Sequence, residues 1–160
     1  MMILVAIGSN LPDPARGLDT PMAVCEAAVT ALRALPDLTI ERVSPWYETA
    51  PVPRSDQPNY CNGVVRFEGE IAPEALLSVL QGIELRFGRE RSVANAARTL
   101  DLDIVAMGAA LRDAPDPILP HPRATQRGFV LLPLRDVAPD WIDPRSGVGI
   151  EALIAALLPE

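Results

Sequence analysis

The sequence predicts an α+β fold: an antiparallel sheet of the ferredoxin-like, split βαβ kind, with helices packed on it and further helices added at the C-terminal end. Two observations carry this prediction. The expected elements run strand, helix, strand, strand, helix, strand, and no connection between them is long enough to separate two domains. We therefore expect one domain over residues 1–160, a length that supports a proper hydrophobic core.

Each element has its own signal in the chain. Residues 2–7 form an apolar run typical of a buried strand, and we expect residues 8–10 to close it as a turn. Residues 19–35 carry apolar side chains at helical spacing. Residues 38–49 alternate and predict a second strand, interrupted near Pro45. The same signals predict a proline-rich loop over 50–58, strands over 60–68 and 100–107, a helix over 73–87, and C-terminal helices over 126–137 and 150–158.

The composition narrows the class of protein. A net charge of −7 argues against a general nucleic-acid surface. No apolar run is long enough to span a bilayer, and the chain starts without a basic leading region, so a cytoplasmic protein is the simplest expectation. Cys25 and Cys61 match no metal-ligand spacing, and we expect reduced thiols in or near the core.

The run from Arg98 to Val105 is the most informative part of the chain. The strand expected over residues 100–107 places Leu100, Leu102 and Ile104 on one face. Asp101 and Asp103 then lie on the other face, roughly 6.5 Å apart at their Cα atoms. Two carboxylates at this spacing suit Mg²⁺, which prefers oxygen ligands. The alternative is an amphipathic edge strand whose acids face water.

The arginines around this run suggest what the two aspartates would work with. All fourteen basic residues are arginine, and several of them cluster on either side of the aspartates. Guanidinium groups match phosphate oxygens in two-pronged geometry, so the cluster suggests a bound polyanion, while the alternative is a set of solvated surface side chains. Carboxylates for Mg²⁺ and arginines for phosphates are the parts that phosphoryl transfer requires. The sequence has neither a P-loop nor the motifs of protein kinases.

Several short motifs, in this order, resemble those of one enzyme family, the 6-hydroxymethyl-7,8-dihydropterin pyrophosphokinases of folate biosynthesis. The resemblance runs the length of the chain. The motifs are Ala6-Ile7-Gly8-Ser9-Asn10-Leu11, Ser44-Pro45-Trp46-Tyr47-Glu48-Thr49-Ala50-Pro51, Asp56-Gln57-Pro58-Asn59-Tyr60-Cys61-Asn62, Ile83-Glu84 with Gly88-Arg89, Arg98-Thr99-Leu100-Asp101-Leu102-Asp103-Ile104, Leu119-Pro120-His121-Pro122-Arg123 and Arg127-Gly128-Phe129-Val130-Leu131.

The resemblance implies transfer of a pyrophosphoryl group from ATP to the hydroxymethyl group of the reduced pterin, giving AMP and the pterin diphosphate. It implies two Mg²⁺ ions held by Asp101 and Asp103, with Arg89 and Arg98 as the other catalytic residues. The residues implied for the pterin are Thr49, Pro51, Val52, Tyr60, Asn62 and Phe129. The residues implied for ATP are Gln81, Glu84, Arg89, Arg91, Arg98, Ile104, His121 and Arg127. The expected partners are these small molecules alone, with no nucleic acid and no membrane, and the expected state is a monomer.

Taken without the resemblance, most of these residues have a plainer interpretation. Tyr60 and Phe129 would be core side chains. Gln81 and Glu84 would be solvated on a helix surface. Two other classes of function also stay open: a binding module without catalysis, and an RNA-binding domain, against which the aromatic fraction of 4% and the net charge speak.

The chain departs from the family pattern in front of the signature arginine. Members often carry a small residue and proline there, frequently preceded by tryptophan, whereas this chain has Asn95-Ala96-Ala97 in a loop about one residue shorter. We expect this loop to be less rigid, since it lacks the proline.

Overall fold

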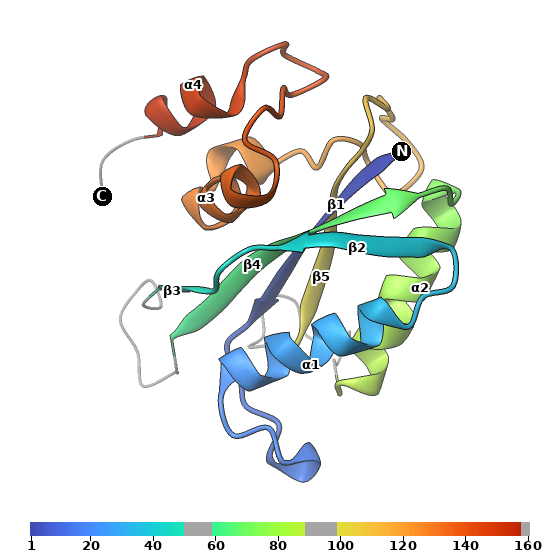
Figure 1. Ribbon diagram of the computed structural model, residues 1–160, viewed down its shortest axis with the longest axis vertical. Coiled ribbons are helices and arrows are strands. Elements are labelled where there is room, and N and C mark those ends of the chain that lie inside the picture. The colour runs from blue at the N-terminus through green and yellow to red at the C-terminus, as the bar shows by residue number, and fades with distance from the viewer. Residues whose placement is uncertain (50–58, 89–98, 158–160) are drawn as a thin grey trace.

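The computed structural model describes residues 1–49, 59–88 and 99–157, and its elements follow the predicted order (Figure 1). The strands are β1 (Met2–Ser9), β2 (Leu38–Val43), β3 (Tyr47–Thr49), β4 (Tyr60–Gly69) and β5 (Asp101–Met107). The helices are α1 (Pro21–Arg33), α2 (Pro73–Arg86), α3 (Gly128–Val137) and α4 (Ile150–Ala155), with single turns of 3-10 helix at η1 (Pro14–Arg16) and η2 (Ala124–Gln126).

The sheet is antiparallel throughout, in the order β2-β4-β1-β5, and β3 adds to it by pairing with the start of β4. The α+β prediction is therefore confirmed. The turn expected at residues 8–10 is wrong in its bounds, because β1 continues through Gly8 and Ser9, which pair with Asn62 and Cys61. That pairing joins segments more than fifty residues apart, so no local signal reveals it.

The interruption predicted near Pro45 separates β2 from β3. Proline has no N–H to give to a ladder, and here Ser44 takes over the pairing. Its backbone N–H donates to the carbonyl of Val64 (3.0 Å), and its hydroxyl accepts from the N–H of Val64 (2.9 Å). The ring of Trp46 then lies against Gly63, where an added Cβ would stand 2.5 Å from a ring carbon. The bend therefore depends on glycine at position 63.

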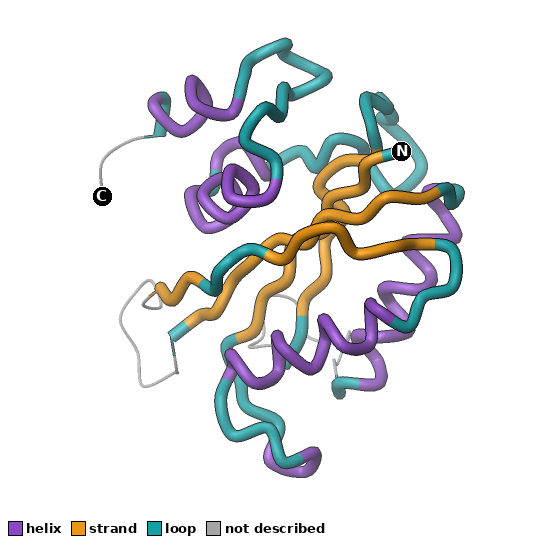
Figure 2. The backbone as a smooth tube through the Cα atoms, in the orientation of Figure 1, coloured by secondary structure: helices purple, strands orange, loops and turns teal. Residues whose placement is uncertain are grey.

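Helices cover both faces of the sheet (Figure 2). The face under α1 and α2 holds one apolar cluster, to which β1 contributes Ile3, Val5 and Ile7. Leu4 of the same strand points the other way, into a second cluster formed largely by α3 and the chain that follows it. This alternation follows from the strand period of two, and β1 therefore contributes side chains to both apolar clusters.

The two cysteines are buried thiols, as predicted. Cys25 and Cys61 are both buried and free, with the Sγ of Cys25 3.7 Å from the carbonyl oxygen of Cys61. The hydrogen bond with Cys61 and burial together raise the pKa of the Cys25 thiol. Over the described ranges, no helix is both long enough and apolar enough to cross a membrane.

Candidate active site

The two aspartates of β5 occupy the face that the strand pattern predicts. Leu102 and Ile104 are buried in the cluster under α1 and α2, so Asp101 and Asp103 lie on the opposite face, where both are half-buried. The residues beside them on β1 are Gly8, opposite Asp101, and Ala6, opposite Asp103. Gly8 has no side chain, which leaves room for a ligand beside Asp101, whereas Ala6, beside Asp103, packs against the second apolar cluster.

Strand register brings the aspartates into line with the predicted pterin residues. Gly8 pairs with Asp101 on one side and with Asn62 on the other, and Asn62 in turn pairs with Tyr47 of β3. Directly opposed residues of neighbouring antiparallel strands put their side chains on the same face. Tyr47, Asn62, Gly8 and Asp101 therefore form a cross-strand row. Asn62 and Asp101 are two strand spacings apart, about 10 Å.

Within this row, the backbone of Gly8 packs closely against the side chain of Asn62. A Cβ added there would stand 2.8 Å from Oδ1 of Asn62, so the Asn62 amide lies against the bare backbone of β1. Any larger residue at position 8 would displace the amide. Thr49, paired with Tyr60 one step further along the edge, is exposed. Both predicted pterin-edge residues thus lie at the end of the sheet where Asp101 begins its strand.

Tyr60 and Phe129 are exposed rings and not core residues, so their plainer interpretation as core packing is wrong. Each is 39% exposed. Tyr60 opens β4 and Phe129 is the second residue of α3. The guanidinium of Arg127 lies over the ring of Phe129, 5.6 Å from its centroid. Large exposed aromatic side chains on two separate elements are what a site for a flat ligand requires.

The segment that carries His121 runs along the outer side of β5. The N–H of His121 donates to the carbonyl of Val105 (2.8 Å), and Nδ1 accepts from the N–H of Arg123 (3.1 Å). Burial and the charge of Arg127 lower the pKa of His121, against an opposing effect of Asp101. The imidazole is therefore neutral near pH 7 with its proton on Nε2, which leaves an N–H donor available. These electrostatic interactions group His121 and Arg127 with Asp101.

Glu84 is almost fully buried, which overturns its plainer interpretation as a solvated helix residue. It is 2% exposed, and its Oε2 accepts from the backbone N–H of Leu102 (2.8 Å), the residue between the two aspartates. Gln81, one turn earlier on α2, is half-buried. No pattern in the sequence indicates this hydrogen bond, because the acceptor of a backbone N–H in an edge strand depends on how the helix packs.

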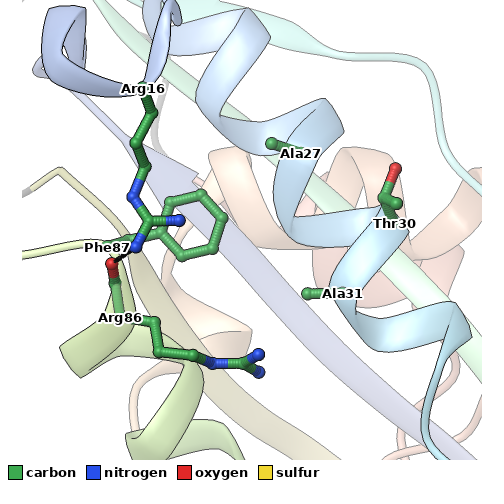
Figure 3. Close-up of a pocket in the computed structure, with 6 residues that line it drawn as sticks. All are labelled: Arg16, Ala27, Thr30, Ala31, Arg86 and Phe87. Atoms are coloured by element: carbon green, nitrogen blue, oxygen red, sulfur yellow. Dashed lines mark hydrogen bonds between the residues drawn. The ribbon is translucent and has the colours of Figure 1, made fainter.

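The end of α2 also makes contacts on the sheet face that it shares with α1. A groove of about 330 Å³ lies between α1 and α2, lined by Arg16, Ala27, Thr30, Ala31, Arg86 and Phe87. In Figure 3 the Arg16 side chain lies over the ring of Phe87, its guanidinium carbon 4.9 Å from the centroid, and donates to the carbonyl of Arg86. None of the predicted substrate residues that the structure describes lines this groove.

The remaining predicted site residues are either described but buried, or outside the described residues. Ile104 is described, but its side chain is buried away from the aspartates, and its contact with ATP stays a prediction. Pro51, Val52, Arg89, Arg91 and Arg98, as well as the loop Asn95-Ala96-Ala97, lie outside the described residues. The sequence does not indicate that Gly8 and Tyr47 lie in one cross-strand row with Asn62 and Asp101. A signal for Tyr47 exists, since it alternates with Thr49 and so shares its face.

The donor set suits Mg²⁺. Asp101 and Asp103 supply carboxylate oxygens from one face of a strand, and in the part of the chain that the structure describes no group of three or more His, Cys, Asp or Glu side chains could hold a metal ion. Mg²⁺ commonly binds through one or two carboxylates, retained waters and substrate phosphates, without an all-protein cage. The two aspartates therefore fit that ion.

Two half-buried aspartates on one face of an α+β sheet are the arrangement expected of a transferase that uses ATP, and the family that the chain matches is of this class. The family model of the 7,8-dihydro-6-hydroxymethylpterin-pyrophosphokinases matches residues 4–139, and the chain belongs to this family. Its activity is the pyrophosphokinase activity of folate biosynthesis.

The relatives cover most of the chain, and each of the three described here is named 2-amino-4-hydroxy-6-hydroxymethyldihydropteridine pyrophosphokinase. The protein of Pseudomonas aeruginosa is 41% identical over 154 residues, 96% of this chain and 90% of that protein. The protein of Synechocystis is 40% identical over 129 residues, 81% of this chain and 66% of that protein. The protein of Haemophilus influenzae is 35% identical over 144 residues, 90% of this chain and 86% of that protein.

Proposed function

We propose that the reaction takes place over the cross-strand row, with the pterin at Asn62 and the triphosphate of ATP at Asp101 and Asp103. The observation that carries this proposal is the register, which puts Asn62, Gly8 and Asp101 side by side on one open face. The pterin hydroxymethyl oxygen attacks the β-phosphorus of ATP. The bond from that phosphorus to the oxygen bridging it to the α-phosphorus breaks, AMP leaves, and the hydroxyl loses its proton.

The chain's own residues bind and orient the two substrates. Tyr60 and Phe129 stack on the two faces of the pterin ring, while Asn62 and Thr49 hydrogen-bond its edge. The Nε2–H of neutral His121 and the Arg127 guanidinium bind phosphate oxygens. Two Mg²⁺ ions held by Asp101 and Asp103 would neutralise phosphate charge and lower the pKa of the attacking hydroxyl. Pro51 and Val52 are proposed as the apolar wall of the pterin site.

The remaining predicted residues are proposed for ATP: Gln81, Glu84, Arg89, Arg91, Arg98 and Ile104. Arg89 and Arg98 complement the charge that develops on the transferred group. The bond from Leu102 to Glu84 supports a role for the end of α2 in this site, because it ties that helix to the aspartate strand.

The test is the formation of AMP from ATP, with and without the reduced pterin, in the wild type, Asp101→Ala and Asp103→Ala. Each substitution should lower pterin-dependent turnover by about a thousandfold or more, since a lost metal ligand costs several kcal/mol of transition-state stabilisation. Thermal unfolding should change little, because removing one carboxylate also relieves repulsion. Asp140→Asn changes an exposed carboxylate elsewhere and is the control. Near-native turnover in either alanine variant would show that the metal assignment is wrong.

We further propose that the protein works as a single-domain monomer in the cytoplasm, where ATP is available. Gel filtration should then give a mass near 17.2 kDa at micromolar concentration, with or without substrates. A dimer under these conditions would contradict the proposal. Failure of the wild type to form AMP when pterin is added would instead favour a binding module without catalysis.

A further inference from the structure

The two rings of the proposed pterin site belong to elements that have no direct connection in the chain. Tyr60 is the first residue of β4 and Phe129 lies near the start of α3. A flat ring held between them needs one van der Waals layer on each side, which sets the separation of the rings at roughly 7–8 Å. A displacement of about 1 Å in such a site can cost a hundredfold in rate. The position of α3 against the edge of the sheet therefore matters to the reaction.

Among the described residues, two side-chain hydrogen bonds join the sheet to α3. Arg66, well along β4 from Tyr60, donates from Nη1 to the carbonyl of Val137 (3.1 Å). The hydroxyl of Tyr47 donates to the carboxylate of Asp136. Of these two donors, Tyr47 is the one that belongs to the cross-strand row, directly opposite Asn62 and two residues before Thr49. It links the helix to the end of the sheet where the pterin is proposed to bind.

Asp136 is well placed to control the direction of Phe129. The two residues are seven positions apart in α3, and seven residues make almost two full turns, so both lie on the same stripe of the helix. A bond at Asp136 therefore fixes the rotation of the helix about its own axis, and with it the direction in which the ring of Phe129 points. The apolar contacts of Val130 and Leu134 on the sheet are non-directional and specify this rotation less sharply.

We infer that Tyr47 and Asp136 are a positioning pair, which aligns the pterin site by tying β3 to α3. This inference rests on the proposed function. Neither residue is among those proposed for ATP or for the metal ions, so we expect the effect of the pair to fall on the pterin. Loss of the pair lets Phe129 turn away from Tyr60 and lets β3 move relative to Asn62. The ATP side, built on β5 and α2, keeps its own supports through Glu84 and Leu102.

The experiment is a double-mutant cycle on the full chain, with the KM for pterin, the KM for ATP, kcat and the melting temperature measured for every variant. Tyr47→Phe and Asp136→Ala should each raise the KM for pterin about fivefold, the size expected for an exposed charge-assisted hydrogen bond. The KM for ATP should stay within twofold. The double variant should be no worse than either single variant, because both remove the same bond. Asp136→Asn should stay near the wild type, since its amide oxygen can still accept from the tyrosine hydroxyl.

Glu151→Gln is the matched control. It weakens another polar link of α3, the ion pair between Arg135 and Glu151 (3.2 Å), which leads to α4 and not to the sheet. The KM for pterin should not change in this variant. Additive effects in the double variant, an equal rise in both KM values, or a lower melting temperature with both KM values unchanged would overturn the inference. Lack of pterin-dependent AMP formation in the wild type would instead count against the proposed function, so the two failures are distinguishable.

Discussion

Glu84 is a buried acidic side chain whose Oε2 accepts from the backbone N–H of Leu102. Removing that acceptor leaves the N–H of Leu102 buried without a partner, which typically costs about 1–3 kcal/mol. Glu84→Ala should therefore lower the free energy of unfolding by about this amount in a urea titration. Glu84→Gln keeps an oxygen at the same place and should lose less. Equal losses in the two variants would show that the charge matters more than the hydrogen bond.

The hydroxyl of Tyr47 provides a pH test at the scale of one residue. Its hydrogen bond to Asp136 raises the pKa of Tyr47 above the usual value near 10. A raised pKa of an acid in the folded state means that the bond stabilises the protein below pH 10 and is lost as the pH rises through the folded pKa. In a Tyr60→Phe background Tyr47 is the only tyrosine, so its absorbance at high pH reports this pKa directly.

Asp136→Ala in that background should bring the Tyr47 pKa back toward 10, because both the hydrogen-bond acceptor and the carboxylate charge that oppose ionisation are gone. No change on this substitution would show that the hydrogen bond does not form in solution. The same measurement is independent of enzyme activity.

Among the elements, β1 depends most on one small residue. Gly8→Ala would push a methyl group against Oδ1 of Asn62, 2.8 Å away, and turn the amide out of the cross-strand row. We expect a rise of roughly tenfold in the KM for pterin, with the KM for ATP much less affected. Gly82→Ala is the control, since a Cβ there meets nothing within 4 Å. It should leave both KM values alone and stabilise α2 by about 0.5–1 kcal/mol. Parallel changes in both KM values for Gly8→Ala would contradict the placement of Asn62.

The strands and helices were largely predictable from the sequence, but their pairing was not. Periodicity identified the strands and helices and put Asp101 and Asp103 on the correct face, because these features depend on neighbours in the chain. It also predicted α3 despite Pro133. It could not give the register of β1 against β4 and β5, which depends on pairing between distant segments. The row from Tyr47 to Asp101, the burial of Glu84 and the continuation of β1 through Ser9 all follow from that register or from helix packing, and so only the structure supplies them.

At the scale of the whole molecule, the two apolar clusters share β1 and should not unfold separately. Leu80 is fully buried in the cluster under α1 and α2, and Leu4 in the cluster beneath α3. Leu80→Ala and Leu4→Ala should each cost about 2–5 kcal/mol and move the same single transition to lower temperature. Calorimetry and circular dichroism check this. A second transition in the Leu4→Ala variant would mean that the C-terminal part unfolds by itself.

The hydrogen bond from Leu102 to Glu84 also affects how the edge of the sheet can interact with other protein chains. β5 lies at the edge of the sheet, and an unpaired edge N–H is where a strand from another chain would add. The carboxyl group of Glu84 already occupies that donor, so a foreign strand would have to displace a buried side chain in order to pair there. The same side chain that supports the aspartate strand thus protects this edge against strand addition and aggregation.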